Sequence, residues 1–221
     1  MIFRLFSNML HNAKCIYWFL ALSYLLTLSI SPYQYSFIHK ALPITILLIV
    51  ALQRLRRHTR IFITSALFFS AIGDMMLALT LEQGFIYGLA AFALAHMCYT
   101  ACFYRWHRWH RRHLIKLTVL VIYVLFMLLL LLPVTGTLQV PLLIYLLLMS
   151  AMAYSAMVVN TANYHILLGA ALFVLSDSLL ATHKFLFLLP YEGLLVMGSY
   201  YSAQYFLLEG CIIKQDSHAL T

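Results

Sequence analysis

Long apolar runs, separated by short polar segments, follow one another along the whole chain. Each run is long enough for a helix that crosses a bilayer, which takes about 20 apolar residues, and a helix satisfies its own backbone hydrogen bonds in lipid. The pattern therefore predicts an all-α, polytopic membrane helical bundle that forms a single integral membrane domain over residues 1–221. Its eight predicted transmembrane helices cover residues 15–31, 36–52, 61–80, 84–104, 114–132, 139–158, 164–183 and 188–208.

Two of the runs carry one carboxylate each. Asp74 and Asp177, in the third and seventh predicted spans, both stand in the pattern small residue, Asp, any residue, apolar residue, Leu, Ala. These spans hold equivalent places in the two halves of the chain, which suggests a parallel four-plus-four repeat. An ionisable residue in hydrocarbon costs several kcal/mol, so it indicates a functional site. The alternative is a buried polar lock in which serines and tyrosines bind each carboxylate.

The distribution of Lys and Arg predicts the orientation. Twelve of these fourteen residues lie at the N-terminus, in the second and fourth loops or in the tail, and basic residues favour the cytoplasmic side. Both termini are therefore predicted to be cytoplasmic, in agreement with an even number of spans. Asp74 then lies about 21 Å of helix beyond Arg60, and Asp177 about 18 Å beyond His165. Both aspartates thus belong to the outer half of the membrane, the side on which Lys40 begins the second span.

Composition excludes a soluble domain. The chain is 64% hydrophobic and 9% charged, with a mean hydropathy of +0.93, and a soluble domain of this size would lack enough polar residues to cover its surface. The net charge of +8 comes from clusters beside apolar runs, which suit anionic lipid headgroups, so no nucleic-acid partner is predicted. We expect an integral multi-pass protein of a bacterial inner membrane, with the lipid bilayer as a partner.

Two further spans present polar side chains on one helical face. In the fourth span small residues share a face with His96 and Tyr99, and in the eighth span Tyr200 shares a face with Gln204. A polar face needs partners inside the bundle, because an unpaired polar group is costly against lipid. For Lys40 two interpretations stay open: its ammonium lines the site, or it extends to the headgroups at the membrane surface.

The segment 105–113 places a histidine at every third position among four arginines and two tryptophans. Such spacing can chelate a metal ion, but the segment offers no negative charge to offset a cation. Basic residues and Trp are ordinary at a membrane interface. We therefore predict no metal site and no cofactor.

Four stretches resemble the YhhN family, whose characterised members are lysoplasmalogenases. They are Gly73-Asp74 followed by apolar residues, Gly88 through His96 and Tyr99, Phe173-Val174-Leu175-Ser176-Asp177-Ser178-Leu179-Leu180-Ala181, and Tyr200-Tyr201-Ser202-Ala203-Gln204. Their order and spacing cover nearly the whole chain. In one departure, Ala41 follows Lys40 and Pro43 comes later, whereas the family often has Pro directly after this lysine.

The resemblance implies a membrane-embedded hydrolase that cleaves the vinyl ether bond of a lysoplasmalogen, a lysophospholipid. The products are a fatty aldehyde and glycerophosphoethanolamine or glycerophosphocholine. It implies catalytic roles for Asp74, Asp177 and His96. Substrate binding is expected from Lys40, Ser176, Ser178, Tyr99, Tyr200 and Gln204.

The residues suit this chemistry in their own right. A vinyl ether is cleaved by protonating its β-carbon, which leaves an oxocarbenium-like cation that water attacks, and paired carboxylates do such work in glycosidases. Burial favours the neutral form of a carboxyl group, so one aspartate can donate a proton while the other stays ionised. Which aspartate takes which role stays open. His96 is a candidate proton shuttle, and Lys40 is a point charge suited to the substrate phosphate.

The lipid headgroup predicts where the site opens. A zwitterionic headgroup is expensive to bury without partners, and the vinyl ether lies only a few bonds from the glycerol. We expect a cleft that opens outward between the second, third and seventh spans. Lys40, Asp74 and Asp177 should line it, with His96 and Gln204 deeper.

Other functions remain as alternatives. Matched intramembrane acids and a repeat also occur in proton-coupled transporters of lipids or small molecules. A metal-dependent lipid hydrolase is disfavoured, because the outer half has too few histidines for a three-ligand site. A receptor or a scaffold is the third alternative. Release of a chemical product by the purified protein separates an enzyme from a transporter.

Overall fold

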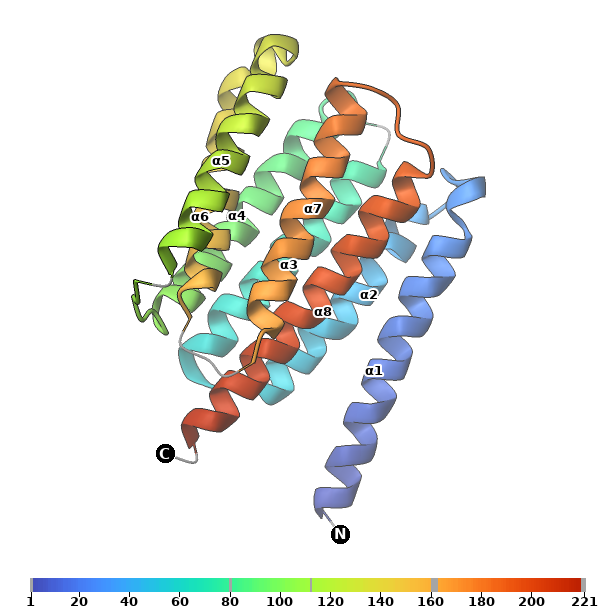
Figure 1. Ribbon diagram of the computed structural model, residues 1–221. Coiled ribbons are helices and arrows are strands. Elements are labelled where there is room, and N and C mark those ends of the chain that lie inside the picture. The colour runs from blue at the N-terminus through green and yellow to red at the C-terminus, as the bar shows by residue number, and fades with distance from the viewer. Residues whose placement is uncertain (1, 80, 112, 160–162, 220–221) are drawn as a thin grey trace.

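The computed structural model describes residues 2–79, 81–111, 113–159 and 163–219, and eight α-helices account for most of them. Within this part of the chain there is no strand, in agreement with the all-α prediction, and the one isolated bridge joins His107 to Val159. The helices are α1 (Ile2–Leu26), α2 (Ser36–Arg54), α3 (Arg57–Ala78), α4 (Gly84–Tyr104), α5 (His113–Leu131), α6 (Gln139–Met157), α7 (His165–Phe185) and α8 (Glu192–Ala219). They form one bundle with both termini at the same end (Figure 1).

Six of the helices, α2 to α7, are long and apolar enough to cross a membrane. The chain is therefore a multi-pass membrane protein. The eight predicted crossings are not confirmed, because α1 and α8 do not reach the same apolarity over the described residues. In α8 the last turns carry Glu209, Lys214 and Asp216, which interrupt the apolar sequence.

Helix α8 is also longer than predicted. It continues to Ala219, whereas the apolar run that predicted it ends near residue 208. The extension has a packing role: the Gln215 amide accepts a hydrogen bond from Arg56 N (2.8 Å) and donates one to Arg54 O (3.3 Å). Hydropathy marks the apolar part of a helix and misses an extension held by polar contacts with another loop.

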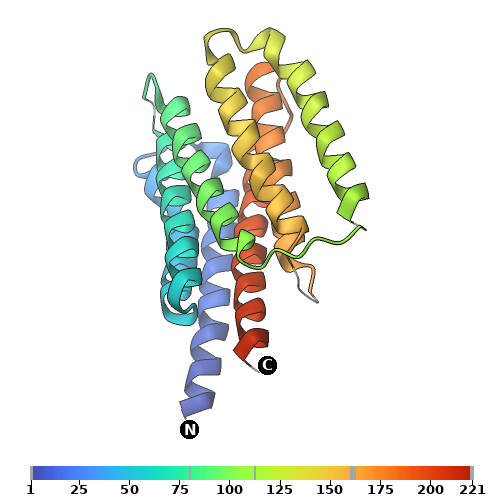
Figure 2. The ribbon, with the colours of Figure 1, turned by 90° about the vertical axis from the view of Figure 1, so that its left-hand side faces the viewer.

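The closest helix pairs are α3 with α4 and α7 with α8. Across the two halves, α4 packs on α6 and α8 packs on α2. If α1–α4 are equivalent to α5–α8, the pair α3–α4 corresponds to α7–α8, and the contact of α4 with α6 corresponds to that of α8 with α2. The four-plus-four repeat itself stays a prediction. Helix α5 lies at the edge of the bundle, where it packs mainly on α6 (Figure 2).

Glycine brings the paired helices into close contact. A Cβ atom at Gly169 of α7 would lie 2.8 Å from Leu207 N and 2.9 Å from Ala203 O of α8. A Cβ atom at Gly88 of α4 would lie 2.7 Å from Leu77 Cγ of α3. Small residues let transmembrane helices approach in this way. The close approach brings the helices of Asp74 and Asp177 next to the tyrosines and the histidine described below.

Candidate active site

A cavity of about 910 Å³ enters the bundle. The loops at its mouth lie at the end of the bundle opposite the two termini (Figure 1). Loop residues that join α1 to α2, α3 to α4 and α7 to α8 surround its mouth. Its volume falls in the range of small-molecule sites, about 300–1,000 Å³. Lys40, Asp74, Ser176, Asp177 and Tyr200 all line it. Five of the nine predicted site residues therefore meet on one cavity.

Asp74 is held on α3 at the inner part of this cavity. Its side chain is almost fully buried, and Tyr200 Oη donates a hydrogen bond of 2.8 Å to Asp74 Oδ2. The Tyr200 ring packs edge-on against Phe92, with 5.7 Å between ring centroids, which fixes the hydroxyl in place. Asp74 Oδ1 has no partner among the hydrogen bonds of the described residues, so this oxygen is available to a ligand or to water.

Lys40 lies close enough to Asp74 for the two charges to interact. No ion pair within 4 Å joins them in the part of the chain that the structure describes. The backbone at Lys40 is fixed by α8, because Tyr201 Oη donates a hydrogen bond of 2.8 Å to Lys40 O. Lys40 is buried and lines the cavity, which favours the first of its two interpretations.

Asp177 is held on α7 by two partners. Tyr145 Oη donates a hydrogen bond of 2.7 Å to Asp177 Oδ2, and His96 Nε2 lies 3.3 Å from the same oxygen and 3.1 Å from Tyr145 Oη. The side chain of Asp177 stays 13% exposed, whereas that of His96 is fully buried. Asp177 thus faces the cavity, with Tyr145 and His96 behind it.

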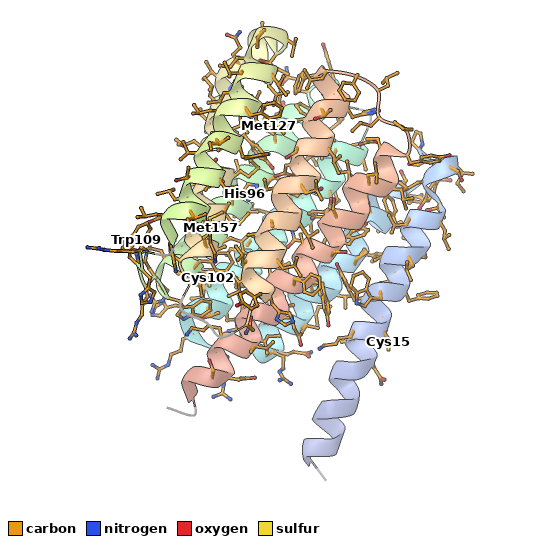
Figure 3. All side chains as sticks on the ribbon, viewed as in Figure 1. Cys15, His96, Cys102, Trp109, Met127 and Met157 are labelled. Atoms are coloured by element: carbon orange, nitrogen blue, oxygen red, sulfur yellow. The ribbon has the colours of Figure 1, made fainter. Side chains whose placement is uncertain are left out.

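His96 does not line the cavity. Its ring packs against Phe173, with 4.8 Å between ring centroids, and lies inside the bundle in Figure 3. The Nδ1 atom is buried without a hydrogen-bond partner in the described part of the chain. His96 therefore touches Asp177 directly and can influence a substrate only through it.

The remaining predicted residues bind other side chains or the backbone. Tyr99 Oη donates to Gln204 Oε1 (2.5 Å), and Gln204 Nε2 donates to Ser70 Oγ (2.9 Å). These three side chains are fully buried and do not line the cavity. Ser176 Oγ donates to Val196 O (2.9 Å), and Ser178 Oγ lies 2.5 Å from Tyr123 Oη.

Tyr145 is the residue that sequence reasoning missed. It stands in the run Leu143-Ile144-Tyr145-Leu146 of α6, where no neighbouring polar residue indicates which way it faces. In the structure it is buried and bound to Asp177. A tyrosine therefore holds each aspartate: Tyr200 of α8 binds Asp74, and Tyr145 of α6 binds Asp177.

Charges of both signs lie around the mouth. Glu82 and Glu192 line the cavity there, together with Lys184, and Glu192 interacts electrostatically with Lys40. A ligand that enters from this end meets cationic and anionic groups within one space. This arrangement suits a zwitterion.

The histidine-rich segment lies at the other end of the bundle, where Trp109 marks its place in Figure 3. The His107 and Trp109 rings pack against Tyr154, at centroid distances of 6.4 and 6.5 Å. Across the residues that the structure describes, no three His, Cys, Asp or Glu side chains are grouped closely enough to hold a metal ion. The segment is separate from the aspartates.

Comparison with known proteins gives the family. The chain is 32% identical over 209 residues to the lysoplasmalogenase TMEM86A of Bos taurus, which covers 87% of this chain and 82% of the relative. The Homo sapiens TMEM86A is 33% identical with the same coverage, and the Mus musculus lysoplasmalogenase TMEM86B is 31% identical over 65% of this chain and 60% of the relative. No solved structure matches. Residues 35–211 match the YhhN family, and since this covers most of the chain, the protein belongs to that family.

Proposed function

We propose that the protein is a membrane-embedded hydrolase that cleaves the vinyl ether bond of a lysoplasmalogen. The observation that carries this proposal is the arrangement of Asp74, Asp177 and Lys40 around one cavity of about 910 Å³. The names of the relatives, which are lysoplasmalogenases, support the substrate class. The products are a fatty aldehyde and the glycerophospho-alcohol that carried the ether oxygen.

The two carboxyl groups divide the reaction between them. One donates its proton to the β-carbon of the vinyl ether, and the double bond becomes an oxocarbenium-like cation. The other carboxylate stabilises this cation and takes a proton from the attacking water, as paired carboxylates do in glycosidases. The hemiacetal then gives its hydroxyl proton to the first carboxylate and breaks its bond to the glycerol oxygen, which takes the proton held by the second carboxyl group, and the aldehyde is released. One water molecule is consumed and both carboxyl groups return to their starting state.

The tyrosines prepare the carboxyl groups for these roles. Tyr200 and Tyr145 each bind the Oδ2 atom of one aspartate. This contact fixes the orientation of the carboxyl plane and leaves the Oδ1 atom without a hydrogen-bond partner among the bonds of the described residues. Holding catalytic groups in a fixed geometry removes part of the entropic cost of reaching the transition state.

The cavity also suits the headgroup of a lysophospholipid. The Lys40 ammonium makes no ion pair within 4 Å in the described part of the chain, so it can bind the substrate phosphate as a point charge. Glu82 and Glu192 line the mouth of the same cavity and can attract the ammonium group of ethanolamine or choline. The headgroup thereby keeps polar partners when it leaves water, which lowers the cost of burying it.

The purified protein in detergent, incubated with a lysoplasmalogen, tests the proposal. We expect release of a fatty aldehyde and of glycerophosphoethanolamine in equal amounts. A lysophospholipid with an ester-linked chain should be left intact, because its ester has no enol ether carbon to protonate. If the protein moves the lysoplasmalogen between vesicles and releases no aldehyde, the transporter alternative holds and the hydrolase proposal is wrong.

We further propose that both termini are cytoplasmic and that the cavity opens on the outer face, as the basic loops predict. The test uses single cysteines at Ser31 on the cavity mouth and at Lys40 within it, on a background that lacks the four native cysteines. A membrane-impermeant thiol reagent should modify both from outside intact cells. A cysteine at the exposed residue His58 serves as the matched control and should react only after the membrane is opened. The reverse pattern would contradict the orientation.

A further inference from the structure

A second, narrower space adjoins the cavity on the side of α4, α5 and α6. It shares five lining residues with the cavity: Leu77, Phe85, Phe92, Asp177 and Leu180. Among the described residues, Asp177 is the one charged residue in its lining. We call this space the side groove. It begins at a candidate catalytic carboxylate and leads away from the headgroup end of the cavity.

The lining of the side groove is almost entirely apolar. Twelve of its sixteen lining residues are Leu, Met, Phe or Ala. The four others bind one another in pairs: Tyr145 donates to Asp177 (2.7 Å), and Tyr123 lies 2.5 Å from Ser178. Beyond these two pairs, the other lining residues offer only hydrocarbon contacts.

Helix α5 closes the groove on the side away from the cavity. Met127 and Leu131 of α5 line it, while residues such as Leu125, Phe126 and Leu129 on the same helix are more than half exposed. The helix packs mainly on α6. Because the open volume is only about 30 Å³, room for about two water molecules, a larger ligand fits only after the groove widens, and α5 is the wall that packs mainly on a single neighbour. Methionine at positions 127 and 149 makes the wall adaptable.

We propose that the side groove binds the hydrocarbon chain of the lysolipid, which enters sideways from the bilayer as α5 moves outward. This inference rests on the proposed function and adds the place of the chain to it. The headgroup occupies the cavity near Lys40, and the chain passes Asp177 into the groove between α4, α5, α6 and α7. A lipid with one chain can take this path without leaving the hydrocarbon layer.

The proposed path of the hydrocarbon chain assigns the roles of acid and base to the two carboxyl groups. In a vinyl ether the α-carbon is bonded to the ether oxygen, on the headgroup side, and the β-carbon continues into the chain. With the chain beyond Asp177, the β-carbon lies beside Asp177 and the α-carbon lies toward Asp74 and Lys40. Asp177 is then the acid that protonates the β-carbon, and Asp74 is the base that takes a proton from the water attacking the α-carbon.

Blocking the groove tests the inference. Met127→Trp fills the groove, whereas Phe126→Trp places the same bulk on the neighbouring exposed position, where the side chain is 53% exposed. Met127→Trp should lower kcat/KM for a long-chain lysoplasmalogen by at least about tenfold, the order expected when even one methylene is excluded from an apolar pocket. A short-chain, water-soluble vinyl ether analogue should be hydrolysed at an unchanged rate, and Phe126→Trp should leave both rates unchanged. Equal loss for both substrates, or no loss for either, overturns the inference.

A binding measurement tests the site of the hydrocarbon chain without relying on the proposed hydrolase activity. Wild-type protein is illuminated with lysophosphatidylethanolamine that carries a diazirine at the end of its ester-linked chain, a lipid that the proposed reaction does not cleave. Labels should appear on α5 and α6 near Met127 and Met149, and excess unlabelled lysolipid should suppress them. Labels confined to α1, α2 or α8, or labels that competition does not suppress, overturn the chain site. Absence of aldehyde in the assay with wild-type protein would instead overturn the hydrolase proposal.

Discussion

Asp177→Asn should lower kcat for vinyl ether cleavage by about 10²–10⁴-fold, the usual contribution of a general acid. The amide keeps the shape of the carboxyl group and can still accept the hydrogen bond from Tyr145, so the protein should remain folded and inserted. An amide cannot donate the proton that the β-carbon needs. The measurement is aldehyde release from a long-chain lysoplasmalogen, with gel filtration in detergent as the check on folding.

Tyr145→Phe is the matched variant for Asp177. It removes one hydroxyl group and leaves the carboxyl group in place, so kcat should fall by less than in Asp177→Asn, with KM little changed. A similar loss in both variants would mean that Tyr145 itself takes part in the chemistry. A rate close to wild type in Asp177→Asn would show that Asp177 is a structural residue and would contradict its assignment as the acid.

Asp74→Asn is expected to lower kcat by a similar factor, about 10²–10⁴-fold, but at a later step. Protonation of the β-carbon by Asp177 is still available, whereas water loses its base and the cation loses a nearby carboxylate. Azide needs no base to attack an oxocarbenium-like cation. Added azide should therefore restore consumption of the vinyl ether in Asp74→Asn and have no effect in Asp177→Asn, where the cation does not form.

Asp216→Asn is the control for Asp74. It makes the same change of charge at an exposed position near the end of α8, away from the cavity, and it should leave the rate within about twofold, as expected of a solvated surface charge. Azide rescue of Asp177→Asn but not of Asp74→Asn would reverse the two assignments. Equal activity of Asp74→Asn and Asp216→Asn would remove Asp74 from the mechanism.

The helices and the two aspartates could be predicted because both have strong local signals. An apolar run of spanning length predicts a membrane helix whatever surrounds it, and the part of the chain that the structure describes contains six such helices. A carboxylate inside such a run is costly enough to indicate a site without knowledge of its partners. Asp74 and Asp177 both lie on the cavity, although their catalytic roles stay proposals.

The partners of the aspartates could not be predicted, because they depend on how helices rotate against one another. Tyr145 gave no signal in its apolar run, yet it binds Asp177. Ser178 was expected to bind the substrate together with Ser176, but two residues along a helix turn a side chain by about 200°, and Ser178 lines the side groove whereas Ser176 lines the cavity. Tyr99 and Gln204 lie on inward faces as predicted, and they bind each other rather than the cavity.

The buried chain of Tyr99, Gln204 and Ser70 has a consequence for the membrane itself. It joins α4, α8 and α3 by side-chain hydrogen bonds, and its three side chains are sealed from solvent. When a cavity that holds water enters a bilayer from one face, only the layer between the inner end of the cavity and the opposite face separates the two solutions. Gln204 accepts the hydrogen bond from Tyr99 through its oxygen and donates to Ser70 through its nitrogen, so this amide does not relay a proton along the chain of hydrogen bonds. The proposed reaction therefore exchanges protons with the solution at the cavity mouth, and its rate should follow the acidity of that compartment rather than that of the other.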